Sequence, residues 1–329
     1  MDGLVQQLKA HCSKIVARGS PLDAYQRDYL KRMLPVLDYY LDIYQHCLLF
    51  LESRLSKPVE EATLVDYGGG HGIFSIVAKQ MGWRQVVYID VNPAAAKTVA
   101  ALADAVGIGP DVILTGDSKS LKKWMQAQGE YPDAVAGMDV IEHVYCLDSF
   151  FGDLASMGQQ APLLLFTTAS NPCNRHVCRK LRKAMRDDEI GSSENPNFFT
   201  LRYEYILSAF PEMDESIAQR WAHDTRGLVY ADILAAVKSD VPNLLGDDFN
   251  TCDPRTGSWT ERILPISDYK DLLQQYGYAL GVENGWYNTH HWLFKRWIAK
   301  LLNRIDAIRF APFIILSADA SLGRKLRDS

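Results

Sequence analysis

The chain has 329 residues, of which 47% are hydrophobic and 23% are charged, so it can bury the core of one large domain or two modest ones. A formal net charge of −5 at pH 7 argues against a general nucleic-acid binder. No apolar run reaches membrane-spanning length and the first residues lack the apolar stretch of a secretion signal, so we expect a cytoplasmic protein. Six scattered cysteines without zinc-site spacing predict free thiols.

Helical spacing of apolar residues, interrupted by Pro35, predicts at least two helices within an amino-terminal helical segment, residues 1–60. From residue 62 to 168, short apolar runs alternate with helical stretches. The runs are TLVDY (63–67), QVVYID (85–90), DVILTG (111–116), DAVAGMDV (133–140) and PLLLFTT (162–168). Five strands alternating with four helices predict a parallel sheet with helices on both faces.

Residues 171–262 break this alternation, because they are polar, contain helical pieces and end in a turn-rich stretch. The alternation resumes with a helix and strand at 267–285, a basic helix at 292–305 and a final strand at 310–318. We therefore expect a sheet domain formed by residues 61–170 and 263–320. Residues 171–262 would form an inserted cap that carries substrate choice.

A glycine cluster follows the first predicted strand, in the sequence LVDYGGGHG (64–72). Such a cluster allows the backbone to approach a ligand closely. A phosphate-binding loop needs Lys and then Ser or Thr after its last glycine, and Ile73 excludes it. The dinucleotide pattern needs a third glycine where Ile73 stands, and Asp66 would repel a pyrophosphate.

The remaining pattern, Asp66 followed by Gly68, Gly70 and Gly72, resembles motif I of the class I S-adenosylmethionine-dependent methyltransferases. The cationic sulfonium and ammonium of that ligand suit an acidic residue beside the loop. The resemblance implies an α/β fold with a Rossmann-like sheet, mostly parallel with its last strand antiparallel, plus N-terminal helices and an inserted helical cap. It also implies S-adenosylmethionine as the cofactor.

The ends of the next two predicted strands extend this resemblance. Asp90 lies 22 residues after Gly68, where a carboxylate can accept both ribose hydroxyls of a cofactor, and Val91 follows it. Asp117 and Ser118 end the third strand, where the resemblance places the adenine ring. Asp90 and Asp117 have an alternative interpretation as helix caps.

The segment DVIEHV (139–144) is similar to the corresponding strand and turn of ubiquinone-biosynthesis-type O-methyltransferases. The resemblance covers residues 62–170 and 265–318, and it places Asp139 among the cofactor-binding residues. His143 is our candidate general base, because an imidazole suits proton removal from a hydroxyl; a structural histidine is the alternative. Asp139, Glu142 and His143 together are also compatible with a divalent ion, so the metal content stays open.

We expect S-adenosylmethionine-dependent O-methylation of a small molecule, such as a sugar, a lipid-linked compound or another biosynthetic metabolite. The alternatives are a non-catalytic S-adenosylmethionine-binding module and an NAD-dependent oxidoreductase. His71 is interpreted as shaping the glycine loop. His290 and His291 lie either in the acceptor pocket or on the surface. The expected partner is the acceptor alone, without nucleic acid, and homo-oligomers are compatible with the sequence.

Two cationic helices remain without an assigned role. Six cations crowd one predicted helix of the insertion: Arg175, Arg179, Lys180, Arg182, Lys183 and Arg186. They indicate either an anionic acceptor or a solvated face partly neutralised by the acidic residues at 187–189. The helix at 292–305 is amphipathic and basic, which is compatible with peripheral membrane contact. We expect the commoner outcome, packing on the sheet or on a partner subunit.

Overall fold

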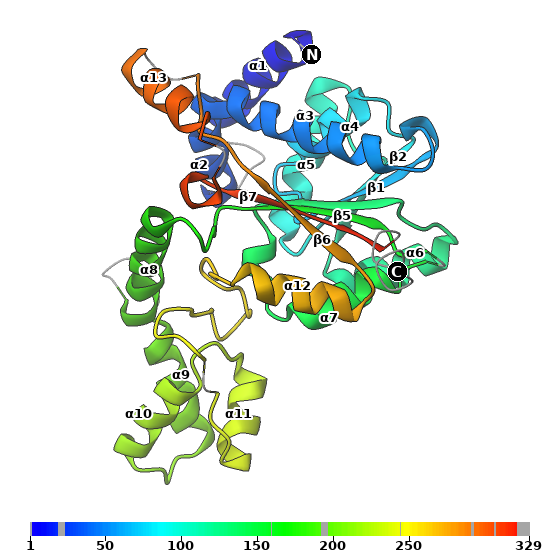
Figure 1. The fold of residues 1–329 in the computed structure, drawn as a ribbon. Helices are drawn as coiled ribbons and strands as arrows, with labels where there is room; N and C mark the ends of the chain where they lie inside the picture. The colour runs from blue at the N-terminus through cyan, green and yellow to red at the C-terminus, as the bar shows by residue number, and fades with distance from the viewer. Residues whose placement is uncertain are drawn as a thin grey trace, which may run out of the picture.

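The computed structural model describes residues 2–18, 24–158, 160–191, 197–243, 245–290, 293–305 and 307–320. Within them lies one seven-stranded sheet with the strand order β3-β2-β1-β4-β5-β7-β6 (Figure 1). Its strands are β1 (Thr63–Tyr67), β2 (Gln85–Asp90), β3 (Val112–Thr115), β4 (Ala134–Met138), β5 (Leu163–Thr168), β6 (Ala279–Asn284) and β7 (Ile314–Asp319). Strand β7 runs antiparallel to β5 and β6, whereas β1 to β5 pair in parallel. The predicted Rossmann-like sheet with an antiparallel last strand is confirmed.

Helices cover both faces of the sheet, because its central strands are apolar on both sides. All five residues of β1 are buried, as expected for a strand between two helical layers. One face packs against α1 (Asp2–Arg18), α2 (Ala24–Met33), α3 (Leu37–Arg54), α4 (Ile73–Gln80) and α5 (Pro93–Val106). The other packs against α6 (Ser118–Gln128), α7 (Leu147–Ala155) and α12 (Ile266–Gln275), as Figure 1 shows.

Pro35 separates α2 from α3, as its position predicted. It lies in the short 3-10 turn Leu34–Val36, where the missing N–H of proline prevents one continuous helix. The resulting bend lets α3 run along the sheet while α2 reaches the glycine loop. The amino-terminal helices therefore form one wall of the crevice at the carboxyl ends of the strands.

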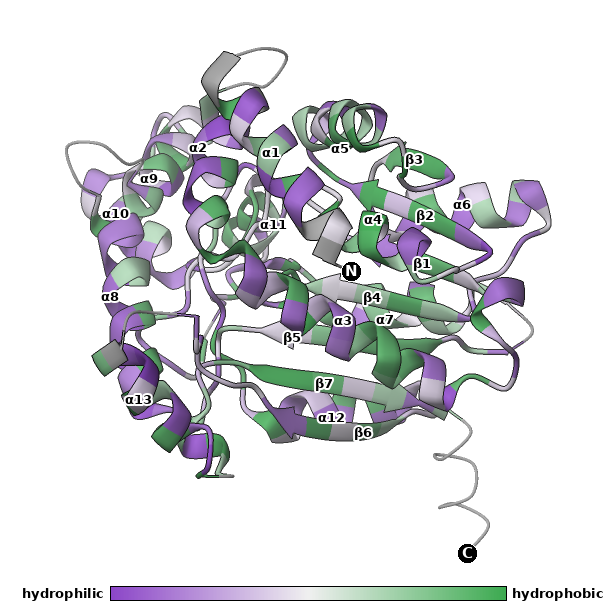
Figure 2. Ribbon diagram, turned by 90° about the horizontal axis from the view of Figure 1, so that it is seen from above, coloured by the Kyte–Doolittle hydropathy of each residue, from purple (hydrophilic) through white to green (hydrophobic). Residues whose placement is uncertain are grey.

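The segment after β5 contains four helices: α8 (Arg175–Ile190), α9 (Phe198–Ala209), α10 (Glu215–Asp224) and α11 (Tyr230–Ser239). Helices α9 to α11 have a small apolar core of their own around Trp221 and project away from the sheet (Figure 1). Helix α13 (Leu293–Leu302) lies between β6 and β7 in the sequence. Figure 2 shows hydrophobic colour along the strands and mixed colour on the peripheral helices. Among the described residues, no helix is long and apolar enough to span a bilayer.

Candidate active site

The three glycines of the loop after β1 differ in their surroundings: Gly68 and Gly72 pack against side chains, and Gly70 faces open space. Gly68, Gly70 and Gly72 all have positive φ, at 66°, 53° and 74°, which favours glycine. A Cβ at Gly68 would collide with Val140, and one at Gly72 would collide with Val99. A Cβ at Gly70 would meet only the ring of Tyr29, at 3.8 Å. Gly70 is therefore the loop position that leaves room for a ligand.

Asp66 is completely buried beneath this loop. Its Oδ2 accepts a 2.6 Å hydrogen bond from the Ser75 hydroxyl, whereas Oδ1 has no partner among the residues that the structure describes. Burial raises the pKa of Asp66 to about 7, because desolvation disfavours the carboxylate. An orphan carboxylate oxygen below the loop can accept from a cationic group or a water, which fits the acidic position of the glycine motif.

Asp90 at the end of β2 fixes the glycine loop. Its Oδ2 accepts from the N–H of Gly70 at 3.0 Å, and its Oδ1 accepts from the N–H of Asn92 at 2.8 Å. The Tyr88 hydroxyl donates to the carbonyl of Gly70 at 2.6 Å. Each carboxylate oxygen of Asp90 keeps a lone pair for a further donor such as a ribose hydroxyl. Val91 is 69% exposed, so it offers an apolar surface beside that carboxylate.

Asp117 and Ser118 already have partners within the protein. Asp117 caps α6, because its Oδ1 accepts from the N–H and the hydroxyl of Ser120. The Ser118 hydroxyl donates to Asp153 at 2.7 Å. The interpretation of Asp117 as a helix cap is thus correct for its Oδ1. Its Oδ2 is the oxygen that could still accept a hydrogen bond from the adenine ring of the cofactor. Asp90 is no cap: Asn92 caps α5.

The backbone of Asp139, directly after β4, has φ of +51°, a conformation in which non-glycine residues are uncommon. Its N–H donates to the Thr167 hydroxyl at 3.0 Å, and that hydroxyl donates to the Asp139 carboxylate at 3.1 Å. Burial raises the pKa of Asp139, an effect that the Thr167 hydrogen bond partly offsets. Strained residues of this kind concentrate at functional sites.

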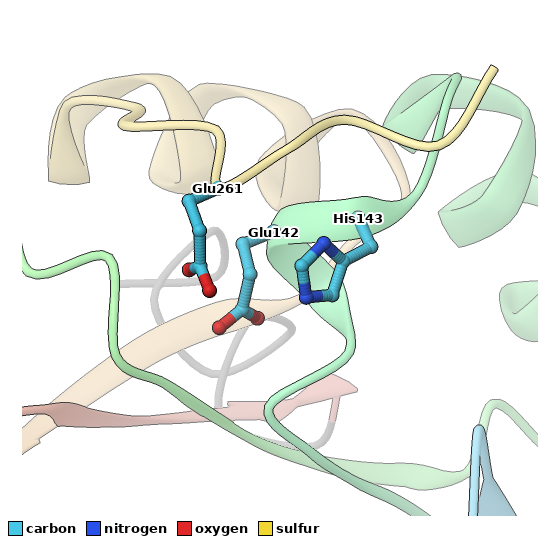
Figure 3. Close-up of side chains that lie close together, drawn as sticks. All are labelled: Glu142, His143 and Glu261. Carbon is cyan, nitrogen blue, oxygen red and sulfur yellow. The ribbon is translucent and has the colours of Figure 1, made fainter. Parts of the chain in front are cut away.

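Three acid–base side chains meet just beyond Asp139, as Figure 3 shows for Glu142, His143 and Glu261. One potential ligand atom from each lies within 4.8 Å of the other two. Glu142 is buried; its Oε1 accepts from the N–H of Ala169, and its Oε2 has no partner within the described part of the chain. Burial, together with the charges of Asp139 and Glu261, raises the pKa of Glu142 well above its ordinary value.

His143 is oriented by the loop that leaves the insertion. Its Nδ1 lies 2.7 Å from the carbonyl of Trp259, which only accepts, so Nδ1 carries the proton and Nε2 keeps a lone pair. The N–H of Trp259 donates to the carbonyl of His143, and the N–H of Arg262 donates to that of Glu142. These bonds place Glu261 in the cluster. The sequence did not reveal Glu261, because no local pattern links it to a turn 118 residues earlier.

A small cavity of about 150 Å³ lies between α3 and the ends of β4 and β5. Its lining includes Tyr39, Tyr40, Tyr44, Asp139 and Thr167. Sequence reasoning missed these tyrosines, because their helical spacing indicated only a packed helix. Their rings form a chain of contacts, with Tyr40 at 5.8 Å from Tyr39 and 6.1 Å from Tyr44 between ring centroids.

The other histidines considered from the sequence lie away from this cavity. His71 is buried and stacks on Tyr29 of α2 at 4.2 Å between ring centroids. Burial lowers the pKa of His71 to about 4, so this residue stays neutral. His290 is exposed and lies 2.8 Å from Asp42, and His291 is outside the described residues.

Comparison with known proteins decides the family. A family model described as "Methyltransferase domain" matches residues 39–232, more than half of the chain. The protein belongs to this methyltransferase family. It is a class I S-adenosylmethionine-dependent methyltransferase, and the oxidoreductase alternative is set aside. The match begins within α3, includes the glycine loop and the cluster residues Glu142 and His143, and ends before Glu261.

Individual relatives of this methyltransferase are distant. The ubiquinone biosynthesis O-methyltransferase of Parvibaculum lavamentivorans is 29% identical over 127 residues, which are 39% of this chain and 48% of that protein. The ribosomal protein L11 methyltransferase of a Cyanothece species is 36% identical over 73 residues, or 21% of this chain and 25% of that protein. The chain thus spans about half or less of these relatives. A magnesium protoporphyrin IX methyltransferase structure from Synechocystis with bound SAH aligns at 15% identity, covering 85% and 82% of the two chains with a TM-score of 0.40.

The methyltransferase uses S-adenosylmethionine, and the crevice fits this cofactor. Gly70 leaves open space, Asp66 has an orphan oxygen beneath the loop, and Asp90 keeps acceptor capacity beside the exposed Val91. These features fit a ligand with a cationic end, a diol and a flat apolar ring. Whether each predicted residue contacts the cofactor stays a prediction.

Proposed function

We propose that this methyltransferase methylates an oxygen atom of a small molecule, with His143 as the general base. The observation that carries the proposal is the bond between His143 Nδ1 and the carbonyl of Trp259, because it leaves the Nε2 lone pair available for a proton. The bound cofactor supplies an electrophilic methyl group. His143 then has one task, which is to accept the proton that the acceptor hydroxyl loses.

The tyrosine-lined cavity supports a small acceptor. A cavity of about 150 Å³ has room for a group of roughly the size of benzene. The lining includes Asp139 and Thr167 at the ends of β4 and β5, so an acceptor there would lie at the carboxyl edge of the sheet, the edge at which the glycine loop follows β1. We also propose that residues 171–262 take part in substrate choice, since they supply Trp259 and Glu261.

The test is turnover of the His143→Ala variant with the acceptor of the parent enzyme. We expect kcat to fall by about two to four orders of magnitude while the affinity for S-adenosylmethionine stays within about twofold. His46→Ala, an exposed histidine that pairs with Glu283 and does not line the cavity, is the matched control and should keep full activity. A His143→Ala variant with a lowered melting temperature but normal activity per folded molecule would overturn the assignment.

A second candidate is an ion-assisted transfer with the same acceptor. The specific observation in its favour is the cluster of Glu142, His143 and Glu261, whose free His143 Nε2 and orphan Glu142 oxygen suit a divalent cation. In that arrangement, the cation would polarise the hydroxyl in place of a base. Chelation that abolishes turnover, with recovery on adding Mg²⁺ or Zn²⁺ to the parent but not to Glu261→Gln, would favour it over the general base.

A further inference from the structure

Helix α13 turns its apolar face away from the protein. Five large apolar side chains are exposed on and just after it: Phe294, Trp297, Ile298, Leu301 and Ile305. Phe294 is 74% exposed and Trp297 is 64% exposed. Their spacing of three, four and seven residues places them along one stripe of the helix. The expectation was packing on the protein's own sheet or on a partner subunit; the first is wrong, and the second stays a prediction.

The contacts of α13 with the rest of the chain come from its opposite side. Ala299 is only 6% exposed, and the side chain of Asn303 bonds both the N–H and the carbonyl of Tyr287 at 2.7 and 3.0 Å. At 100° per residue, Ala299 and Asn303 lie about half a turn away from Phe294 and Leu301. The helix is therefore attached by its polar and small residues, and its apolar stripe faces outward.

Cations border this apolar stripe. Lys295, Arg296 and Lys300 are exposed on α13 and Arg304 is exposed just after it, and Arg309 and the 38% exposed Phe310 follow in the next turn. None of these five cations forms an ion pair within the part of the chain that the structure describes. Apolar side chains flanked by long cationic ones are typical of a helix that lies in the interface of an anionic membrane.

A basic groove on α8 adds further cations to those around the apolar stripe of α13. The groove has a volume of about 620 Å³ and is lined by Arg175, Arg179, Arg182, Lys183 and Arg186, together with Pro172 and Cys178. Of the three acidic residues expected to neutralise it, two are engaged elsewhere, since Asp188 accepts from Thr260 and Glu189 pairs with Arg202, whereas Asp187 is exposed on α8. Within the described residues, none of the lining cations forms an ion pair.

The two surfaces lie on the same side of the molecule, at the left of both Figure 1 and Figure 2. Hydrogen bonds join the two surfaces. The side chain of Asn171, ahead of α8, donates to the carbonyls of Ile308 and Ala311, and that of Asn174 donates to Ala311 as well. The turn after α13 is thus fixed to the start of α8, so both can face one plane.

We propose that α13 and the α8 groove form a docking surface for an anionic lipid membrane. Charge complementarity selects this occupant: the chain carries a net charge of −5, yet ten cations gather on this side around exposed aromatic and aliphatic side chains. A nucleic acid would use the cations but leaves the apolar stripe uncovered. The lining of the tyrosine-lined cavity includes Pro312 and Phe313, which closely follow Phe310 of this surface in the sequence, so a docked enzyme could take an acceptor from the lipid. This last step rests on the proposed function, whereas the docking does not.

The test is co-sedimentation of the full chain with vesicles of phosphatidylcholine alone and with 30% phosphatidylserine. We expect binding to the anionic vesicles that weakens steeply with salt. Trp297→Ser should lower the partition coefficient at least tenfold, and Arg179→Ala with Arg182→Ala should lower it by about fivefold for each cation removed. Ile217→Ser and Lys238→Ala, exposed residues on α10 and α11, are the controls and should bind as the parent does.

Equal binding to neutral and anionic vesicles, or no binding to either, would overturn the proposal. So would a dimer in lipid-free solution that Trp297→Ser dissociates, because the apolar stripe would then be a subunit interface. Binding of single-stranded RNA that Trp297→Ser leaves unchanged, without vesicle binding, would also overturn it. Methyl transfer is not measured in any of these assays, so their outcome is independent of the proposed reaction.

Discussion

Replacing Asp90 with alanine should weaken the binding of S-adenosylmethionine and so tests the predicted cofactor site. In the crevice, the Asp90 carboxylate holds the N–H groups of Gly70 and Asn92 and still has acceptor capacity for the ribose. Hydrogen bonds to a charged group contribute about 1.5–3 kcal/mol. The dissociation constant of S-adenosylmethionine should therefore rise about 10- to 150-fold in Asp90→Ala.

Part of this loss would come from a looser glycine loop, and Tyr88→Phe isolates that part. It removes the hydroxyl bond to the carbonyl of Gly70 but keeps the carboxylate of Asp90. A neutral hydrogen bond contributes about 0.5–1.5 kcal/mol, so affinity should fall by about tenfold at most. Isothermal titration calorimetry on both folded variants gives the comparison. Affinity of Asp90→Ala equal to that of the parent, or no weaker than that of Tyr88→Phe, would refute the ribose assignment.

Two further predictions concern the buried polar groups of the site. Thr167→Val removes both hydrogen bonds that the threonine hydroxyl shares with Asp139, and it should lower the free energy of unfolding by about 1–3 kcal/mol in urea titrations; unchanged stability would contradict the described pairing. The pKa of Asp66 is about 7 in the folded chain and near 3.9 when unfolded, so the folded state binds the proton more tightly and its stability should fall as the pH rises from about 4 to 7. Asp66→Asn should lower the dependence of the unfolding free energy on pH by up to about 1.4 kcal/mol per pH unit. Urea titrations of cofactor-free protein at pH 5 and pH 7 give the unfolding free energy at each pH. The same change in unfolding free energy between the two pH values in parent and variant would argue against a buried, proton-binding Asp66.

The features that could be predicted from the sequence are those with a local pattern. The apolar runs of β1 and β2 needed no tertiary information, because strands buried on both faces read as continuous apolar segments. The glycine loop could also be predicted, since Gly68, Gly70 and Gly72 all adopt positive φ, for which glycine is the favoured residue. Pro35 marked the break between α2 and α3 for an equally local reason.

The features that could not be predicted depend on contacts between distant segments. Glu261 joins His143 only because the loop after the insertion pairs with the turn after β4. The tyrosines of α3 line a cavity only because the helix lies over the ends of β4 and β5. The sequence of α13 showed that the helix is amphipathic. It could not show that the apolar stripe faces outward, because the orientation of the helix depends on the hydrogen bonds between Asn303 and Tyr287.

The most direct test of the account is to follow the methyl group itself. The parent enzyme would be incubated with methyl-¹³C-labelled S-adenosylmethionine and a panel of small hydroxylated acceptors, with ribosomal protein as a competing acceptor, and the products analysed by NMR and mass spectrometry. We expect label on an oxygen atom of a small molecule, and loss of that label in His143→Ala. Label on a nitrogen atom or on the protein acceptor would contradict the proposed reaction, and cofactor binding without any turnover would leave only a binding module.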